Sequence, residues 1–298
     1  MQRELKPFNF TYARSSAGVS LSHSLRYNAR QVIWLVGGSG SGKSTLLHLL
    51  KGFHPEFLAG DVSGNDPAIF KEAMYMAQNP ISQIVHERVG EEFFFTLENQ
   101  HASIESMHAA RHWLTEFGLQ NKENASTSQL SHGLAQRLIL ASQLAAEPSW
   151  LLLDEPTAFL NPSMRDEFYE ILKSLKQHVG MVLIDHHPHA SKIADACWHV
   201  NAQGLITEMS VDEWMSLQTQ EIKQEMEHPT DDWIVQPLNG AFELSAHHMA
   251  VGYKKNPLFT AHFALKSGEC AVLIGDNGAG KSTLFNTLPG MQKPLSGD

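Results

Sequence analysis

The sequence is poor in three features that each mark a class of protein. It has two cysteines, Cys197 and Cys270, which form no C-x-x-C motif, so a reducing cytosol is the default compartment. No apolar run approaches the roughly 18 residues that span a bilayer, and no hydrophobic signal core follows the N-terminus. Acidic residues outnumber basic ones. The resulting net charge of -10 argues against nucleic acid as a partner and against direct docking on anionic lipid.

The sequence does contain two copies of a glycine-rich motif. Residues 37–44 and 275–282 both fit G-x-x-x-x-G-K-[ST], the pattern of a phosphate-binding loop. The rest of the 298 residues, 42% hydrophobic and 18% charged, suits a globular protein of one or two domains. Only sixteen residues follow the second motif, so we expect one complete unit and a truncated second copy.

Short apolar runs predict the core of the first copy. Residues 31–36 indicate a buried strand before the first loop and 44–51 a helix after it, which is the context that the motif requires. The runs at 73–77, 150–153 and 181–184 predict further parallel strands, and 197–200 with 205–209 a closing hairpin. A helical insert is expected at about 85–147, with one apolar stripe over 104–117. Asn161-Pro162 predicts a helix start.

The chain divides at an acidic stretch, 221–232, which predicts a solvated linker. After it the pattern restarts: Tyr253 precedes Lys281 by 28 residues, as Tyr12 precedes Lys43 by 31, and a strand-like run leads into each loop. We therefore expect domain 1 at 1–220, a linker at 221–240, and the opening of a second copy at 241–298.

The first loop predicts a cradle for nucleotide phosphates. Backbone N–H groups and the helix N-terminus supply positive potential, Lys43 reaches the β- and γ-phosphates, and Ser44 ligates Mg²⁺. The remaining predicted contacts are Gly37, Gly38, Ser39, Gly40, Ser41, Gly42 and Thr45. For the second loop, the predicted nucleotide contacts are Gly275, Gly278, Gly280, Lys281, Ser282 and Thr283, and Ser282 is also a predicted Mg²⁺ ligand.

Two carboxylates end the buried run at 150–153. Asp154 suits the Mg²⁺ shell, and Glu155 suits polarisation of an attacking water. The alternative is a pair of acids capping the next helix. The preceding phosphate-binding loop favours the catalytic interpretation.

Taken in order, these motifs resemble those of the ABC (ATP-binding cassette) ATPases. The resemblance covers residues 5–210, and from 242 onward only the opening of a second cassette. It implies an α/β fold, a P-loop NTPase of ABC type with a parallel-sheet core, an antiparallel β subdomain and a helical insert, acting on ATP with Mg²⁺. The matching positions are Tyr12, 37–44, Gln78, 130–137, Asp154, Glu155, Asn161 and His186.

The resemblance implies roles for residues outside the loops. Tyr12, and Tyr253 in the second copy, would stack on adenine; the alternative for Tyr12 is a core aromatic. Gln78 would sense the γ-phosphate and Mg²⁺, or else be a turn residue. His186 would contact the γ-phosphate. A metal site at 185–189 is disfavoured, because no other acidic motif supplies companion ligands.

The signature segment departs from the family pattern L-S-G-G-Q. Ser131 and Gly133 are present, but His132 adds bulk and Leu134 removes an amide. In this family the signature acts across a dimer, so we expect the defect to weaken the site built with the second loop, by roughly 1.5–3 kcal/mol. Asn161 replaces the usual aspartate and still suits a helix cap.

Segments 53–62, 78–85, 89–92 and 97–99 resemble tandem-cassette energy-coupling factor (ECF) ATPases. This implies the motor of an importer for a vitamin or metal ion at the cytoplasmic face of the cell membrane. Its partners would be a transmembrane coupling subunit, a substrate-binding membrane subunit, and a second cassette from this chain, a homodimer or a paralogue. The alternatives are a soluble tandem protein acting on the ribosome or nucleic acid, which the short acidic linker disfavours, and a catalytically silent nucleotide-binding fragment.

Overall fold

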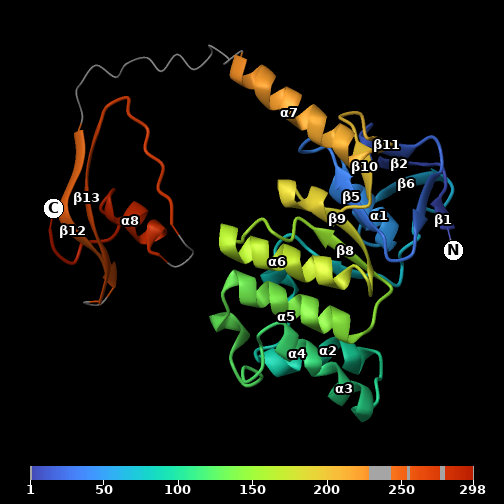
Figure 1. Ribbon diagram of the computed structural model, residues 1–298, viewed down its shortest axis with the longest axis horizontal. Helices are drawn as coiled ribbons and strands as arrows, with labels where there is room; N and C mark the ends of the chain where they lie inside the picture. The colour runs from blue at the N-terminus through green and yellow to red at the C-terminus, as the bar shows by residue number, and fades with distance from the viewer. Residues whose placement is uncertain (1, 228–242, 254–255, 276–278, 298) are drawn as a thin grey trace. The chain divides into compact units, whose positions relative to one another are not determined.

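The computed structural model describes residues 2–227, 243–253, 256–275 and 279–297. They belong to two compact units, Met1–Glu221 (unit 1) and Ile222–Asp298 (unit 2), whose elements are labelled in Figure 1. The buried hydrophobic clusters of the two units are separate. Helix α7 (Val211–Glu227) continues into the segment expected to be a linker, and the rest of that linker, 228–242, lies outside the described residues. None of the helices in the described ranges is long and apolar enough to cross a membrane.

Unit 1 is built on a nine-stranded mixed sheet in the order β6-β2-β3-β11-β10-β5-β9-β8-β7. Every residue of β5 (Val32–Val36), β8 (Trp150–Asp154) and β9 (Gly180–Ile184) is buried, as expected for strands with both faces covered. These strands pair in parallel with one another, with β7 (Met74–Met76) and with β10 (Ala196–Val200). The predicted parallel-sheet core is confirmed.

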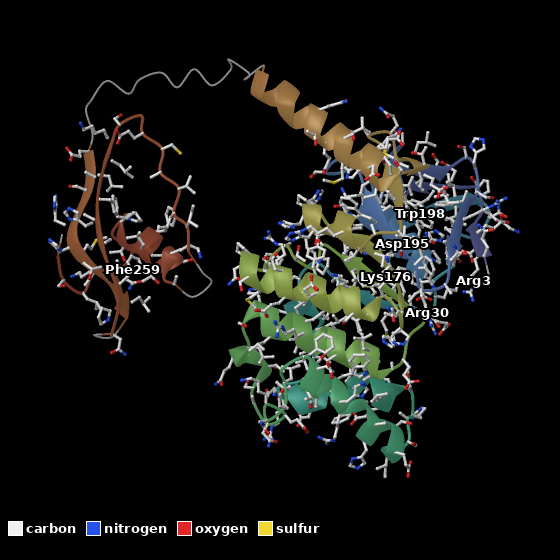
Figure 2. All side chains as sticks on the ribbon, in the orientation of Figure 1. Arg3, Arg30, Lys176, Asp195, Trp198 and Phe259 are labelled. Carbon is white, nitrogen blue, oxygen red and sulfur yellow. The ribbon has the colours of Figure 1, made fainter. Side chains whose placement is uncertain are left out.

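Antiparallel strands complete the sheet. β2 (Phe8–Tyr12) pairs with β3 (Gly18–Leu21) and β6 (Gly60–Gly64), and β10 forms the predicted hairpin with β11 (Leu205–Met209). A separate ribbon joins β1 (Gln2–Leu5) to β4 (Leu25–Asn28). Figure 2 labels Trp198 of β10, which is fully buried and contacts the Tyr27 ring edge-to-face at 6.3 Å. The predicted antiparallel β subdomain is therefore present.

The predicted helical insert is present as α2 (Val89–Asn99), α3 (Ile104–Ala110), α4 (His112–Glu116) and α5 (His132–Ala145), with 3₁₀ turns η1 (Pro80–Gln83) and η2 (Thr127–Gln129). These helices gather at the end of unit 1 remote from β1 and β2 (Figure 1). The stripe over 104–117 forms two helices that meet at Arg111, where one was expected.

The predicted helix start at Asn161 is observed. Its Oδ1 accepts from the backbone N of Met164 at 2.9 Å, and α6 (Pro162–Leu175) follows. Just beyond α6, the Lys176 ammonium donates to Asp195 Oδ1 at 2.5 Å, while Asp195 Oδ2 accepts from the backbone N of Val32 at 2.9 Å (Figure 2). This link ties the end of α6 to the start of β5, and so fixes the strand that enters the first glycine loop.

Side chains of the central strands alternate between two cores. Trp34, Leu151 and Leu153 belong to one hydrophobic cluster, whereas Leu35 and Leu152 belong to the cluster on the other face of the sheet. This alternation follows from the two-residue period of a strand. Both faces of the sheet therefore contribute to stability.

Leu152→Ala should destabilise unit 1 by about 2–5 kcal/mol, because it leaves a cavity under a fully buried strand. The free energy of unfolding, measured by urea titration, checks this value. Leu217→Ala is the control, since Leu217 is 38% exposed on α7 and its loss should change stability by about 0.5 kcal/mol or less. Equal effects of the two substitutions would contradict the core assignment.

Unit 2 consists of a hairpin, β12 (Glu243–Tyr253) and β13 (Asn256–Lys266), and helix α8 (Lys281–Thr287). The strand expected before the second loop is not formed, and Val272 and Ile274 are 80% and 86% exposed. In unit 1 the equivalent strand, β5, is paired on both sides by β9 and β10. Within the described part of unit 2, only β12 and β13 are strands, so this run has no parallel neighbour with which to pair.

Candidate functional site

The first glycine loop connects β5 to helix α1 (Lys43–Lys51), as predicted. At Gly37 φ is +145°, and a Cβ there would lie 2.1 Å from the carbonyl O of Val200. At Gly42, the residue before α1, φ is +103° and a Cβ would lie 2.5 Å from Cγ1 of Val19. Only glycine fits these two positions, so the backbone path of the loop depends on them.

Lys43 lies folded back across this loop. Its Nζ donates to the carbonyl oxygens of Gly37 at 2.9 Å and Gly38 at 2.8 Å. Burial lowers the pKa of Lys43, opposed by the nearby Glu155 and Asp154 carboxylates. Ser41 Oγ is buried and has no hydrogen-bond partner among the described residues. An unpaired hydroxyl and a buried ammonium in a glycine cradle fit the phosphate oxygens of a nucleotide.

Two of the four predicted metal ligands, Ser44 and Asp154, lie together next to Lys43. Ser44 Oγ donates to Asp154 Oδ1 at 3.1 Å, and Asp154 is only 6% exposed. Burial raises the pKa of Asp154, and the hydrogen bond from Ser44 opposes that shift. A hydroxyl and a carboxylate oxygen at this spacing are the kind of ligands that Mg²⁺ takes. Gln78 is placed with Glu155 instead.

The three predicted catalytic residues meet at one point. Gln78 Nε2 donates to Glu155 Oε2 at 2.9 Å across 77 residues of sequence, and His186 Nε2 lies 3.3 Å from Glu155 Oε1. The φ of Glu155 is +45°, which is strained for a residue with a side chain and often marks a functional site. Its backbone N donates to Ile184 O at 2.8 Å, so β9 holds it in place. Both carboxylate oxygens are thus oriented, while the catalytic roles stay predictions.

Tyr12 lies over the start of α1. Its hydroxyl is 2.5 Å from Thr45 Oγ1, and its ring contacts Phe10 edge-to-face at 5.0 Å. Tyr12 is half-buried and packs against the hydrophobic cluster that contains Phe10. Thr45 therefore anchors Tyr12 beside the loop, and adenine stacking stays a prediction.

The signature residues form the start of α5. Ser131 Oγ accepts from the backbone N of Leu134 at 3.3 Å, and the His132 ring stacks on Phe159 at 5.4 Å. A Cβ on Gly133 would lie 1.6 Å from Cε of Met164, so Gly133 packs closely against α6. Within the described ranges, neither Ser131 nor Gly133 hydrogen-bonds to loop 37–44.

The second loop repeats part of the first. Lys281 Nζ donates to Gly275 O at 2.6 Å, six residues earlier, as Lys43 does to Gly37. Gly280 has φ +92°, and a Cβ there would lie 2.9 Å from Phe259 (labelled in Figure 2). Thr283 is buried, and Ser282 is exposed at the start of α8. Gly278 and the side chain of Tyr253 lie outside the described residues.

Sequence reasoning missed two pairs of side chains around the acids, Asp185 with Thr157 and Tyr75 with His48. Asp185 accepts from Thr157 Oγ1 at 2.6 Å and from the backbone N of His187 at 2.8 Å, so it fixes the backbone on either side of His186. Tyr75 OH lies 3.4 Å from Asp154 Oδ2 and 2.9 Å from His48 Nε2. Burial raises the pKa of Tyr75, so the phenol keeps its proton. The sequence predicted that 73–77 is a strand of the same sheet as 150–153, but it did not predict that these two strands are neighbours.

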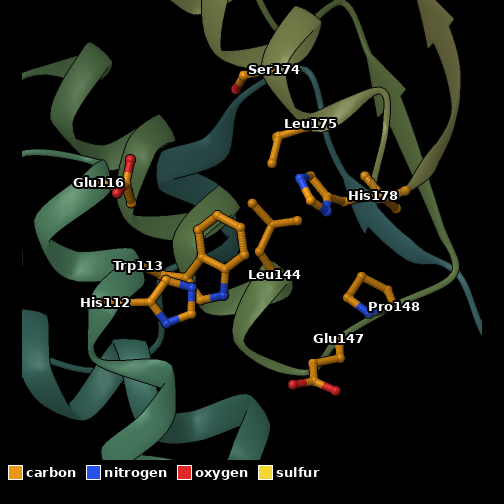
Figure 3. A pocket seen from close by; sticks show the side chains of 10 residues that line it. His112, Trp113, Glu116, Leu144, Glu147, Pro148, Ser174, Leu175 and His178 are labelled. Carbon is orange, nitrogen blue, oxygen red and sulfur yellow. The ribbon is translucent and has the colours of Figure 1, made fainter.

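A separate hollow of about 650 Å³ lies between α4 and the C-terminal ends of α5 and α6 (Figure 3). None of the predicted site residues lines it. Its lining residues are His112, Trp113, Glu116, Leu144, Glu147, Pro148, Ser174, Leu175, His178 and Val179.

Comparisons with known proteins agree with this geometry. The family model described as ABC transporter matches residues 22–158 and 258–298, and each range contains one glycine loop. Energy-coupling factor transporter ATP-binding protein EcfA1 of Leuconostoc mesenteroides is 33% identical over 67% of this chain and 78% of its own. A Bacillus anthracis protein, provisionally named an ABC transporter ATP-binding protein, is 30% identical over 99% of this chain. The chain spans 62% of the length of that relative.

Two solved structures share the fold. The cbiO1 structure from Clostridium perfringens, part of the ABC transporter complex cbiONQ, has a TM-score of 0.60 at 21% identity, covering 76% of this chain and 95% of its own. The ADP conformation of MJ1267, an ATP-binding cassette of an ABC transporter, has a TM-score of 0.59 at 19% identity, covering 76% and 98%.

Proposed function

Because this chain belongs to the ABC transporter family of ATPases, we propose that loop 37–44 binds ATP and that Glu155 promotes its hydrolysis to drive an ECF-type importer. The observation that carries this proposal is the meeting of Gln78 and His186 on the two oxygens of Glu155, next to Asp154 and Lys43. The capping alternative for the two acids is disfavoured, because both side chains face partners in the site.

The proposed chemistry follows from these contacts. Lys43 leaves its two carbonyl partners and holds the β- and γ-phosphates against the loop. Glu155 accepts a proton from water, whose oxygen bonds to the γ-phosphorus as the bond to the β,γ-bridging oxygen breaks, and ADP and phosphate leave. Ser44 and Asp154 would hold Mg²⁺, which when bound neutralises charge on the phosphates. Gln78 and His186 keep the Glu155 carboxylate aimed at the water.

Coupling to transport requires other surfaces and chains. Ser131 and Gly133 would face ATP held by a second cassette, which is supplied by this chain, a homodimer or a paralogue. The likeness to EcfA1, and the fold shared with cbiO1, support partnership with a transmembrane coupling subunit and a substrate-binding membrane subunit at the cytoplasmic face of the cell membrane. A vitamin or a metal ion is the class of cargo proposed.

Uptake by intact cells tests this function. Deleting the gene should abolish ATP-dependent uptake of one vitamin or transition-metal ion, and the wild-type gene, but not the Glu155→Gln gene, should restore it. A panel of radiolabelled vitamins and metal ions provides the measurement, and Glu170→Gln, an exposed substitution on α6, is the matched control. Unchanged uptake of the whole panel, with the protein sedimenting on ribosomes instead, would contradict the proposal.

A further inference from the structure

The two oxygens of Asp154 have different partners. Oδ1 accepts from Ser44, the proposed metal-binding hydroxyl, at 3.1 Å, and Oδ2 faces the Tyr75 hydroxyl at 3.4 Å. A carboxylate held at one oxygen still rotates about its last single bond, whereas a donor on the second oxygen fixes its plane. Tyr75 therefore occupies the position from which the orientation of Asp154 can be set.

The proton chain around Tyr75 has one consistent direction. An ionised carboxylate only accepts, so the single hydroxyl proton of Tyr75 points to Asp154. His48 Nε2, 2.9 Å from the same hydroxyl oxygen, must then be the donor. The chain runs from His48 through Tyr75 to Asp154, and each member fixes the next.

Packing and backbone contacts hold Tyr75 in this position. Its ring centroid lies 5.4 Å from that of His48 and 5.3 Å from that of Phe53, and the latter two lie 5.5 Å apart. Its carbonyl oxygen accepts from Gln83 Nε2 at 3.0 Å and from Gln143 Nε2 at 2.7 Å. The ring contacts with His48 and Phe53 fix the Tyr75 side chain. The hydrogen bonds from the two glutamine amides fix its backbone in β7.

Strand β7 and the residues that follow it therefore contact both acids. Tyr75 reaches Asp154, and Gln78, three residues later, reaches Glu155 at 2.9 Å. We propose that Tyr75, held by His48, is a positioning residue that orients the Asp154 carboxylate for Mg²⁺. This inference rests on the proposed function, because it assigns Asp154 to the metal of the ATP site.

Mg²⁺-dependent binding of a fluorescent ATP analogue, N-methylanthraniloyl-ATP, to the full-length protein tests the inference. In excess EDTA, Tyr75→Phe should bind the analogue within twofold of the wild-type affinity. The Mg²⁺ concentration that gives half of the affinity increase should rise about 10-fold, the usual effect of losing a group that orients a metal ligand. His48→Leu should shift it in the same direction, and His48→Gln, which keeps a donor, should shift it less.

Tyr27→Phe is the matched control, because Tyr27 is a buried tyrosine on β4 that packs on Trp150 and Phe70. Its Mg²⁺ midpoint should equal that of the wild type. The positioning role would be overturned if Tyr75→Phe kept the wild-type Mg²⁺ midpoint, or if it lost the same factor of analogue affinity in Mg²⁺ and in EDTA. Either result would leave the proposed function standing. Absence of analogue binding in the wild type itself would overturn both.

Discussion

Replacing Glu155 by glutamine should reduce ATP hydrolysis by about 100-fold or more and leave ATP binding nearly unchanged, since loss of a general base costs about 10²–10⁴ in rate. Glutamine keeps the shape and one acceptor oxygen, so it can still accept from Gln78, which now donates to Glu155 at 2.9 Å. It cannot take a proton from water. The rate of phosphate release, measured alongside the nucleotide dissociation constant, separates the two effects.

The control for this substitution is Glu170→Gln, whose side chain is 75% exposed and pairs with Lys173. It should hydrolyse ATP at the rate of the protein that carries Lys281→Ala alone. Both proteins should also carry Lys281→Ala, so that the second loop contributes no turnover. Hydrolysis by the Glu155→Gln protein within threefold of the control would remove Glu155 from the base role.

Lys43→Ala should weaken ATP binding by about 100-fold, because it removes charge-assisted hydrogen bonds worth about 1.5–3 kcal/mol each. The ammonium is buried and now bonds to two carbonyl oxygens of the loop at 2.9 and 2.8 Å, so it is placed within the cradle before nucleotide arrives. Isothermal titration calorimetry with ATP and excess Mg²⁺ measures the loss directly.

Lys51→Ala, at the other end of the same helix, is the matched control. Lys51 Nζ donates to the carbonyl oxygen of Lys71 at 2.5 Å, away from the loop, so its loss should leave ATP affinity within twofold. Lys281→Ala should remove any second binding event and leave the first. An equal loss of affinity in the Lys43 and Lys51 variants would show that the effect comes from helix stability and not from phosphate contact.

The buried strands could be predicted because each is a short apolar run covered on both faces. Val32–Val36 and Gly180–Ile184 are buried at every residue, and the Asn161 cap follows from a local side-chain preference. The unpaired run before Gly275 could not be predicted from its own residues, since a strand forms only with neighbours. The apolar spacing of 104–117 likewise does not predict that the helix is divided in two at Arg111.

The site residues likewise fall into those predicted by local sequence motifs and those brought together only by strand pairing. The glycine loops and the acid pair are local motifs, so their residues were predicted. The contact of Gln78 with Glu155, and of Tyr75 with Asp154, depends on the pairing of β7 with β8. Tyr75 pairs with Leu152, and Asp154 lies two residues further on the same face of the strand. Knowledge of that register would have been needed to place Tyr75 beside the acid.

A structure of the full-length protein with Mg²⁺ and a non-hydrolysable ATP analogue tests the central claim most directly. We predict that the β- and γ-phosphates lie in loop 37–44, that Lys43 Nζ contacts them in place of the Gly37 and Gly38 carbonyl oxygens, and that Glu155 faces the γ-phosphate. Nucleotide bound elsewhere in unit 1, or Glu155 turned away from the γ-phosphate in a closed pair of cassettes, would contradict the account.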